Sequence, residues 1–219
     1  KMKKKIIVLM GGISGERKIS LLSGNACYEA LKKNKAYNVL KLDYKGNLID
    51  YLNKIKPDIV FNALHGKFGE DGFVQSILEF SKIKYTHSGV YSSSIAIDKE
   101  ISKKKFIENK ILTPQFIIYE FNKDKNLLQK LKNKKINFPV VIKPINEGSS
   151  LGVHICNKKN IFKKVKLLKN YKSILIENYI PGKEIQVAIM GKKKLGAIEL
   201  KPRRKFYDYF AKYSKSAKT

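Results

Sequence analysis

The first eighty residues of the chain alternate short apolar stretches with stretches of helical period. The apolar stretches are Ile6–Met10, Tyr37–Leu42 and Asp58–Ala63. The helical patterns cover about Glu16–Lys33, Leu48–Ile55 and Phe73–Phe80. Strands that are apolar along their length and alternate with helices indicate a parallel sheet with right-handed crossovers. We therefore predict an α/β fold that begins with a parallel sheet.

The ends of the predicted strands are the natural place for a ligand. In open parallel sheets, ligands bind outside the carboxyl ends of the strands. The segments Gly11–Ser14 and Leu64–Gly66 both fall at such ends. Ser14 is a candidate cap for the first helix, whose predicted apolar positions are Ile19, Leu22, Ala26 and Ala30.

The rest of the chain changes character near Tyr85–Ser94. We expect helices at about Ile95–Asn109, Lys123–Asn133 and Asn160–Leu168. We expect strands at Gln115–Tyr119, His154–Cys156 and Ile174–Glu177, and a hairpin of Glu184–Met190 with Leu195–Glu199. The basic, aromatic tail from Arg203 to Thr219 has weak periodicity and is predicted to be a loop.

The stretch FPVVIKPINEGSSLGV (138–153) combines a strand with a loop of small residues. Its apolar run ends in Lys143, and Pro144 forces a turn because proline cannot continue a central strand. The loop that follows brings backbone N–H groups and hydroxyls near a bound anion, and Lys143 adds a positive charge. This pattern is typical of a phosphate-binding loop, although a serine-rich hairpin with a solvated lysine would have the same residues.

Composition narrows the class of protein. The formal net charge of +28 comes almost entirely from scattered lysines, which favours a codon bias over a nucleic-acid-binding face. Cys27 and Cys156 are too few for a disulfide framework, which predicts a reducing cytoplasm. The apolar stretch Ile6–Met10 is too short for a signal peptide, and no apolar run approaches the roughly 20 residues that span a membrane.

Six motifs in order carry a resemblance to a known family. They are GGISGERKISLLSG (11–24), ALHGKFGEDGFVQSILE (63–79), YTHSGVYSSSIAIDKEISK (85–103), FPVVIKPINEGSSLGV (138–153), ILIENYIPGKEIQVAIMG (174–191) and FYDYFAKY (206–213). Together they resemble the D-alanine–D-alanine ligases of the ATP-grasp superfamily. The resemblance implies an N-terminal Rossmann-like domain at 1–86, a central small ATP-grasp domain at 87–173, and the start of the C-terminal ATP-grasp domain at 174–219.

The resemblance also implies a nucleotide site. Phosphate-binding residues would be Lys99, Lys143, Lys212 and the loop residues Glu147, Gly148, Ser149 and Ser150. Glu177 would accept the adenine amino group, backbone groups of Asn178 and Ile180 would read the adenine edge, and Glu184 would bind the ribose hydroxyls. Outside the resemblance, each lysine or glutamate in so polar a chain is equally a solvated side chain.

Three residues are implied as catalytic. Glu16 would face the ammonium of the first D-alanine and connect by hydrogen bonds to Ser149 and Tyr213, and His65 would lie near that substrate's carboxylate. A glutamate at a helix N-terminus is also favoured by the helix dipole alone, and a lone histidine is more often structural. Tyr213 favours dipeptide over depsipeptide formation.

The implied reaction joins two D-alanines for peptidoglycan synthesis. ATP would phosphorylate one carboxylate, the second amine would attack the acyl phosphate, and Mg²⁺ or Mn²⁺ would neutralise the phosphates. We expect a cytoplasmic protein that binds small molecules, without nucleic acid or membrane partners, and the family suggests a homodimer. The family pattern continues into a segment with the metal ligands, so we expect no metal ligand within residues 1–219 and no turnover by this chain alone.

Two positions depart from the family pattern. His87 stands where glycine is common, and Phe210 stands where glutamate is common. Two alternatives stay open at this point. One is another ATP-grasp carboxylate–amine ligase, and the other is a non-catalytic basic protein that binds nucleotides or nucleic acid, which would cluster its arginines on one face.

Overall fold

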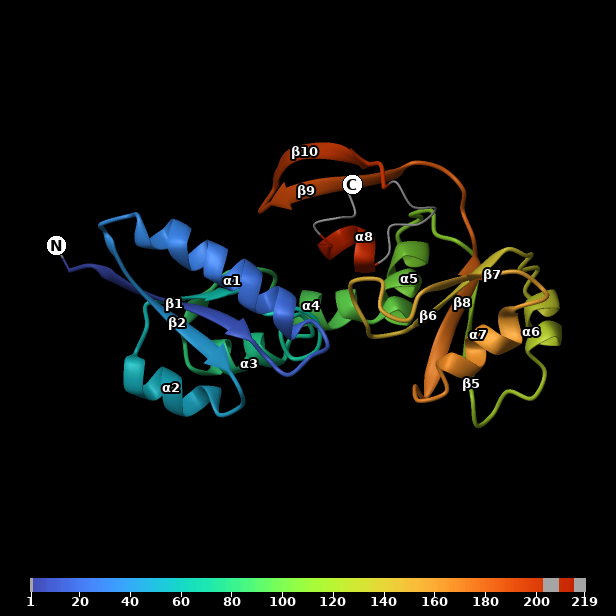
Figure 1. Ribbon diagram of the computed structural model, residues 1–219, viewed down its shortest axis with the longest axis horizontal. Coiled ribbons are helices and arrows are strands. Elements are labelled where there is room, and N and C mark those ends of the chain that lie inside the picture. The colour runs from blue at the N-terminus through green and yellow to red at the C-terminus, as the bar shows by residue number, and fades with distance from the viewer. Residues whose placement is uncertain (1, 203–208, 215–219) are drawn as a thin grey trace. The chain divides into compact units, whose positions relative to one another are not determined.

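A computed structural model describes residues 2–202 and 209–214, without the side chains of Tyr209 and Phe210. The chain divides into two compact units, Lys1–Lys105 with Asn146–Gly148, and Phe106–Ile145 with Ser149–Thr219. Figure 1 labels their helices and strands. The predicted α/β class is confirmed, while the predicted three-part division at 1–86, 87–173 and 174–219 stays a prediction.

The first unit contains a four-stranded parallel sheet in the order β2-β1-β3-β4, of which Figure 1 labels β1 and β2. Its strands are β1 (Lys4–Gly11), β2 (Tyr37–Tyr44), β3 (Ile59–Asn62) and β4 (Lys84–Tyr85). Its helices are α1 (Arg17–Lys32), α2 (Leu48–Ile55), α3 (Phe73–Phe80), α4 (Val90–Ile97) and α5 (Lys99–Glu108), the last of which runs on past Lys105. The parallel sheet predicted from the alternating pattern is confirmed; the two-residue strand β4 was not predicted.

Strand β1 is buried on both faces of the sheet. Ile7 and Leu9 pack into a cluster with the apolar sides of α2 and α3, whereas Val8 and Met10 pack into a second cluster with residues of α1. This double burial explains why the strand is apolar without alternation. Burying both faces also fixes the position of the β1 end, from which the first loop leaves.

The buried face of α1 differs from the predicted one. Leu22 is 69 % exposed, and Ala26 and Ala30 are exposed too, while Ser20 and Gly24 are the buried positions. A Cβ on Gly24 would lie 2.5 Å from the Cβ of Met10, so only glycine allows this approach of helix and strand. The prediction was wrong because the fully buried positions are small residues, and the apolar residues that pack beside them, such as Leu21 and Tyr28, are not the predicted ones.

The single helix predicted at about 95–109 is two helices. The chain leaves the helical conformation at Asp98 (φ −85°, ψ 105°), which separates α4 from α5. Asp98 Oδ1 accepts the N–H of Ile101 at 2.9 Å, and it thereby caps the new helix. Lys99 is consequently the first residue of α5 and not a mid-helix residue.

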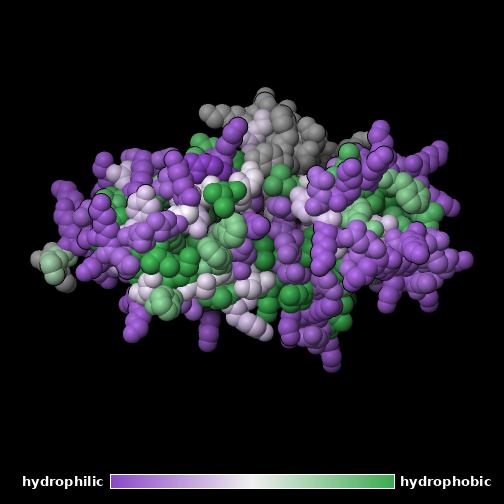
Figure 2. Space-filling view, turned by 90° about the horizontal axis from the view of Figure 1, so that it is seen from below, coloured by the Kyte–Doolittle hydropathy of each residue, from purple (hydrophilic) through white to green (hydrophobic). Residues whose placement is uncertain are grey.

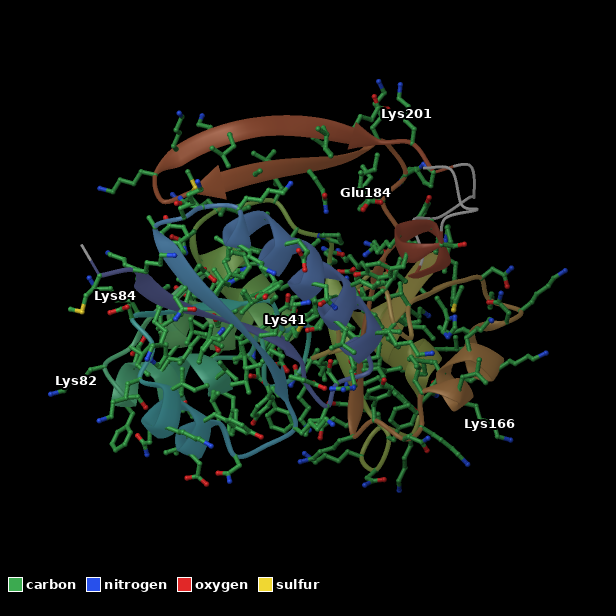
Figure 3. All side chains as sticks on the ribbon, turned by 60° about the vertical axis from the view of Figure 1, so that its left-hand side comes forward. Lys41, Lys82, Lys84, Lys166, Glu184 and Lys201 are labelled. Atoms are coloured by element: carbon green, nitrogen blue, oxygen red, sulfur yellow. The ribbon has the colours of Figure 1, made fainter. Side chains whose placement is uncertain are left out.

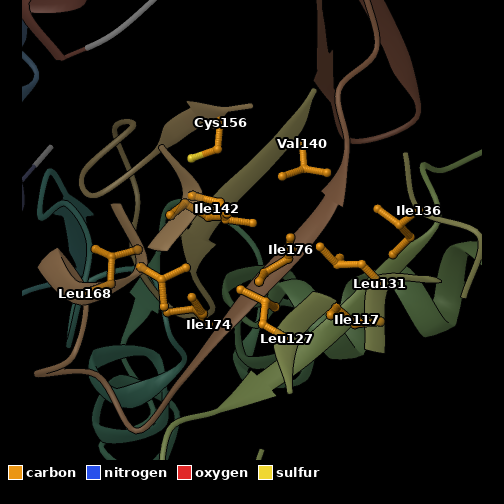
Figure 4. Close-up of a cluster of buried hydrophobic side chains, with 12 residues drawn as sticks. Ile117, Leu127, Leu131, Ile136, Val140, Ile142, Cys156, Leu168, Ile174 and Ile176 are labelled. Atoms are coloured by element: carbon orange, nitrogen blue, oxygen red, sulfur yellow. The ribbon is translucent and has the colours of Figure 1, made fainter. Parts of the chain in front are cut away.

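The second unit is built on a four-stranded antiparallel sheet in the order β5-β8-β6-β7. Its strands are β5 (Phe116–Glu120), β6 (Val140–Pro144), β7 (His154–Cys156) and β8 (Ser173–Asn178). Helices α6 (Leu127–Asn133) and α7 (Ile161–Leu167) supply Leu131 and Ile161 to the core, much of which Figure 4 shows. Figure 4 also shows Ile142 and Ile176 of the two central strands in this core.

A hairpin and a short helix complete this unit. Strands β9 (Glu184–Met190) and β10 (Lys193–Leu200) pair antiparallel, as predicted. Helix α8 (Tyr209–Tyr213) lies in the tail that was predicted to be a loop, so that prediction was wrong for these five residues. Helix α6 begins at Leu127, four residues after the predicted Lys123, because the side chain of Asn126 accepts the N–H of Gln129 and caps it there.

Hydrophilic side chains cover much of the face drawn in Figure 2. Lys82 and Lys166 extend away from the ribbon (Figure 3). No helix within the described ranges is long and apolar enough to cross a membrane.

Candidate functional site

The loop after β1 is fixed by an ion pair. Arg17 donates two hydrogen bonds of 2.7 Å to the carboxylate of Asp43 at the end of β2, and a third of 3.0 Å to the carbonyl of Gly12. These hydrogen bonds hold the pKa of Asp43 below its usual value. Gly11, at φ +82°, has no room for a side chain because a Cβ would lie 2.0 Å from Asp43 Oδ1. The loop is thereby tied to the neighbouring strand.

Three serines connect the first helical region to the end of β3. Ser14 Oγ donates to the carbonyl of His65 at 2.7 Å, and Ser20 Oγ donates to the carbonyl of Ala63 at 2.7 Å. Ser23 Oγ lies 2.9 Å from Nε2 of His65. Ser14 was predicted to cap the helix; its Oγ accepts the N–H of Glu16 at 3.2 Å, while Glu16 itself is the N-cap residue. The two strand ends predicted to carry a ligand are joined by these bonds.

His65 has a neighbour at each ring nitrogen. Nε2 faces Ser23, and Nδ1 lies 3.8 Å from Oε1 of Glu70. The other carboxylate oxygen of Glu70 accepts the N–H of Gly66 at 2.9 Å. The imidazole is therefore held within the loop that carries it.

Glu16 lies at the start of α1 and is 3 % exposed. Its Oε2 would be 2.5 Å from a Cβ on Gly66, which adopts φ +68°, and 3.1 Å from a Cβ on Gly148, so the carboxylate lies close to both glycines. Glu16, the residue after His65 and the loop residue Gly148 thus meet in one unit. Glu16, His65 and Gly148 were predicted as site residues, and their shared role stays a prediction.

Lys99 reaches the same loop segment. Its Nζ donates a short hydrogen bond to the carbonyl of Glu147. Because Lys99 begins α5, its ammonium lies near the residues that come directly before the Gly148–Ser150 turn. A lysine that contacts the loop backbone is placed where it can also contact an anion bound under that loop.

Lys143 and Glu177 form a partly buried ion pair on the antiparallel sheet. Lys143 of β6 pairs in register with Leu175 of β8, which places Glu177 two residues along the same face. Their side chains are 21 % and 9 % exposed, and the ammonium and carboxylate are in direct contact. Lys143 and Glu177, two of the residues that were predicted to bind the nucleotide, therefore lie together.

The remaining adenosine-binding candidates follow along the chain from β8. Asn178 ends β8, its N–H donates to the carbonyl of Gln115 at 3.1 Å, and its Oδ1 accepts the N–H of Asn137 at 3.0 Å. Ile180 is 64 % exposed in the connection to the hairpin. Glu184 is the first residue of β9, where Figure 3 labels it, and is exposed. These bonds fix the backbone that would read the adenine edge.

The backbone of the serine loop passes through the left-handed region. The left-handed positions are Ser149 (φ 49°) and Ser150 (φ 61°), whereas Gly148 is not in this conformation. Ser149 Oγ and the hydroxyl of Tyr213 on α8 lie 2.6 Å apart. These two side chains are therefore in contact in the second unit, while the predicted hydrogen bonds from Glu16 to them stay a prediction.

Lys212 lies in α8, one residue before Tyr213. Of the two departures from the family pattern, His87 adopts φ 83°, a conformation that favours glycine, and its ring packs edge-on against Phe61 at 6.3 Å. The side chain of Phe210 lies outside the described residues. Within the described ranges no three His, Cys, Asp or Glu side chains gather as a metal site.

Comparison with known families decides what this arrangement belongs to. The family model described as "D-ala D-ala ligase C-terminus" matches residues 108–219, and the "D-ala D-ala ligase N-terminus" model matches residues 47–88. The chain belongs to the D-alanine–D-alanine ligase family. The family assignment predicted from the six motifs is confirmed.

Relatives within the D-alanine–D-alanine ligase family are close. A D-alanine–D-alanine ligase of Pelagibacter ubique is 61 % identical, over 100 % of this chain and 71 % of its own length. That of Wolbachia pipientis wMel is 44 % identical over 95 % of this chain, which spans only 65 % of the relative. The crystal structure of the Bacillus anthracis ligase matches with a TM-score of 0.82 and 37 % identity, over 98 % of this chain and 70 % of its own.

Sequence reasoning missed several residues that support the candidate site. Ser23 and Glu70 contact the ring of His65, and Arg17 and Asp43 fix the loop before Glu16. The serine lies 42 positions from the histidine, so nothing in a local pattern pairs them. The available signal was the repetition of serines in ISGERKISLLS, of which Ser14 precedes α1 and Ser20 and Ser23 lie on the side of α1 that meets the end of β3.

Proposed function

We propose that this chain carries the ATP site and the first-substrate site of an ATP-dependent D-alanine–D-alanine ligase. The observation that carries the proposal is the Lys143–Glu177 pair at the ends of two central strands, in a chain of this family. A crystal structure of the Bacillus anthracis ligase, 33 % identical with a TM-score of 0.77, is a complex with ATP. The whole-length activity, substrates and partners are part of the proposal, because the chain spans 65–71 % of its relatives.

The nucleotide would take over the contacts of the ion pair. Lys143 would turn from Glu177 to the phosphates, and Glu177 would accept the amino group of adenine. Lys99 and the Glu147–Ser150 turn would cover the phosphates, and Glu184 would bind the ribose. Lys143 would keep a partner of opposite charge, whereas Glu177 would exchange the ammonium for the neutral amino group of adenine.

Each charged end of the first D-alanine would face a side chain that suits its charge. The buried carboxylate of Glu16 suits an ammonium, and His65 suits a carboxylate. The dipeptide would form by attack of the second D-alanine's amine on an acyl phosphate of the first, with inorganic phosphate leaving. Ser149 and Tyr213 would orient the loop around the peptide bond that forms.

The expectation that residues 1–219 hold no Mg²⁺ ligand stays a prediction. Mg²⁺ usually reaches such sites held largely by the substrate's phosphates and water, so we expect it to arrive with ATP. We infer a cytoplasmic protein, where ATP is abundant, and a homodimer that a sedimentation measurement would detect.

Stereoselective binding tests the substrate assignment. Saturation-transfer NMR on the protein with a non-hydrolysable ATP analogue should detect D-alanine and should give no signal with L-alanine. The variant Glu16→Gln should lose the D-alanine signal, while Glu29→Gln, an exposed glutamate of the same helix, should keep it. Equal signals from both enantiomers would contradict the substrate assignment.

A further inference from the structure

The serine-to-histidine contact between α1 and the β3 end is used by no step of the proposed reaction. Ser23 Oγ lies 2.9 Å from His65 Nε2, and it also lies 3.1 Å from the carbonyl of Ile19 and 3.3 Å from that of Ser20. A serine hydroxyl has one proton to donate and lone pairs to accept with. The direction of the bond to the ring therefore depends on where that proton goes.

The helix itself offers the hydroxyl proton an acceptor. Serines inside helices commonly donate to the carbonyl four residues earlier, and Ile19 holds that position relative to Ser23. Once the proton is directed to the helix carbonyls, the lone pairs of Ser23 face the ring. The nitrogen opposite must then be the donor, which requires a proton on Nε2.

The contact at the other ring nitrogen is longer than a hydrogen bond. Nδ1 faces the carboxylate of Glu70 at 3.8 Å, and Glu70 is held in place by the N–H of Gly66. Ser14 fixes the backbone of the histidine, because its Oγ donates a hydrogen bond to the carbonyl of His65. Two ring nitrogens and the main chain are thus each contacted, so the ring has one orientation.

We propose that Ser23 is a positioning residue that holds His65 with its proton on Nε2. The two side chains that would recognise the first substrate, Glu16 and His65, are then set from the same helix. Glu16 starts α1, and Ser23 two turns later fixes His65. A rigid helix keeps the distance between the two recognition groups constant.

The effect of Ser23 on D-alanine binding rests on the proposed function. The effect of Ser23 on the tautomer of His65 does not. Long-range ¹H–¹⁵N NMR of the ¹⁵N-labelled chain reads the protonation of each ring nitrogen, and the chain has only three histidines. His87→Gln and His154→Gln identify the His65 signals. We expect a protonated Nε2 in the parent protein and, in Ser23→Ala, a mixture of both tautomers.

Two further variants separate positioning from general loss of structure. Ser23→Thr retains the hydroxyl and should restore the single tautomer, while Ser76→Ala, which removes an exposed hydroxyl bonded to the Phe73 carbonyl, should change nothing. D-alanine affinity should fall about five- to tenfold in Ser23→Ala, the range that one neutral hydrogen bond supplies, with ATP affinity unchanged.

The outcomes are distinct. An unprotonated Nε2 in the parent chain, or His65 signals unaltered by Ser23→Ala, would overturn the positioning role whatever the protein binds. A His65 tautomer that changes as expected, without any binding of D-alanine, would support the positioning role and contradict the proposed substrate. If Ser23→Ala does not fold, the parent spectrum and Ser23→Thr still decide the tautomer.

Discussion

Replacing Ser20 by alanine should destabilise the first unit far more than its small size suggests. Ser20 is fully buried, its Oγ accepts the N–H of Gly11 at 2.8 Å, and it donates to the carbonyl of Ala63 at 2.7 Å. The substitution leaves one buried donor and one buried acceptor without this partner. Each such loss costs about 1–3 kcal/mol, and the better helix propensity of alanine returns about 0.5 kcal/mol.

The expected loss is about 1.5–5.5 kcal/mol in the free energy of unfolding, a large share of the 5–15 kcal/mol that a typical domain has. Urea denaturation followed by far-UV circular dichroism gives the difference by linear extrapolation. Amide exchange of β1 assigns the loss to the first unit, because the most protected amides exchange through global unfolding.

Ser76→Ala is the matched control. Its hydroxyl donates to the carbonyl of Phe73 at 2.7 Å but is exposed, so water replaces the lost bond and the change should stay within about 0.5 kcal/mol. A Ser20→Ala protein as stable as Ser76→Ala would refute the reasoning. It would mean that the ends of β1 and β3 are not held together through this hydroxyl.

Three further predictions follow from packing and charge. A glycine-to-alanine change inside a helix usually stabilises it by about 1 kcal/mol, but Gly24→Ala should lower the melting temperature because the new Cβ would lie 2.5 Å from Met10 Cβ. The control Ala26→Gly, at an exposed position of the same helix, measures the effect of helix propensity alone. A rise in melting temperature for Gly24→Ala would contradict the close packing. Lys143→Met and Glu177→Leu should each cost about 2–4 kcal/mol by leaving a partly buried charge, with the double variant close to the parent in urea denaturation; additive losses would show that the pair is not coupled. Burial, and next the charge of Lys164, lowers the pKa of His154, so the stability that its neutral form contributes is complete above about pH 6.5 and is lost as the pH falls from there towards the folded-state pKa. An NMR titration of His154 should give a midpoint below about 6.5, and His154→Gln should flatten that part of the stability profile. A midpoint above about 6.5 would reverse the sign of the pH dependence.

Much of the fold could be predicted because its strongest signals are local. Helices α2 and α3 and strand β7 begin and end at the predicted residues, since apolar period and flanking Gly or Pro mark them. The parallel first sheet followed from the apolar β1. The buried face of α1 could not be predicted in this way, because Ser20 and Gly24 are selected by closeness to Met10 and to the strand ends.

The candidate site divides along the same line. Motif residues such as Lys143 and Glu177 were predicted, and the structure brings these two together on neighbouring strands. Two supporting contacts have no local signature in the sequence. Ser23 and His65 are 42 positions apart, and Arg17 and Asp43 are 26 positions apart. Long-range hydrogen bonds of this kind depend on the completed sheet.

The central claim is that Lys143 and Glu177 form part of an ATP site. Isothermal titration calorimetry of ATP into the protein measures it directly, with Lys143→Met as the test and Lys163→Met, an exposed lysine of α7, as the control. The account predicts one ATP site, weakened at least about tenfold by the loss of the Lys143 charge and unchanged by the control. An absence of ATP binding by the folded protein, or equal affinity in both variants, would contradict it.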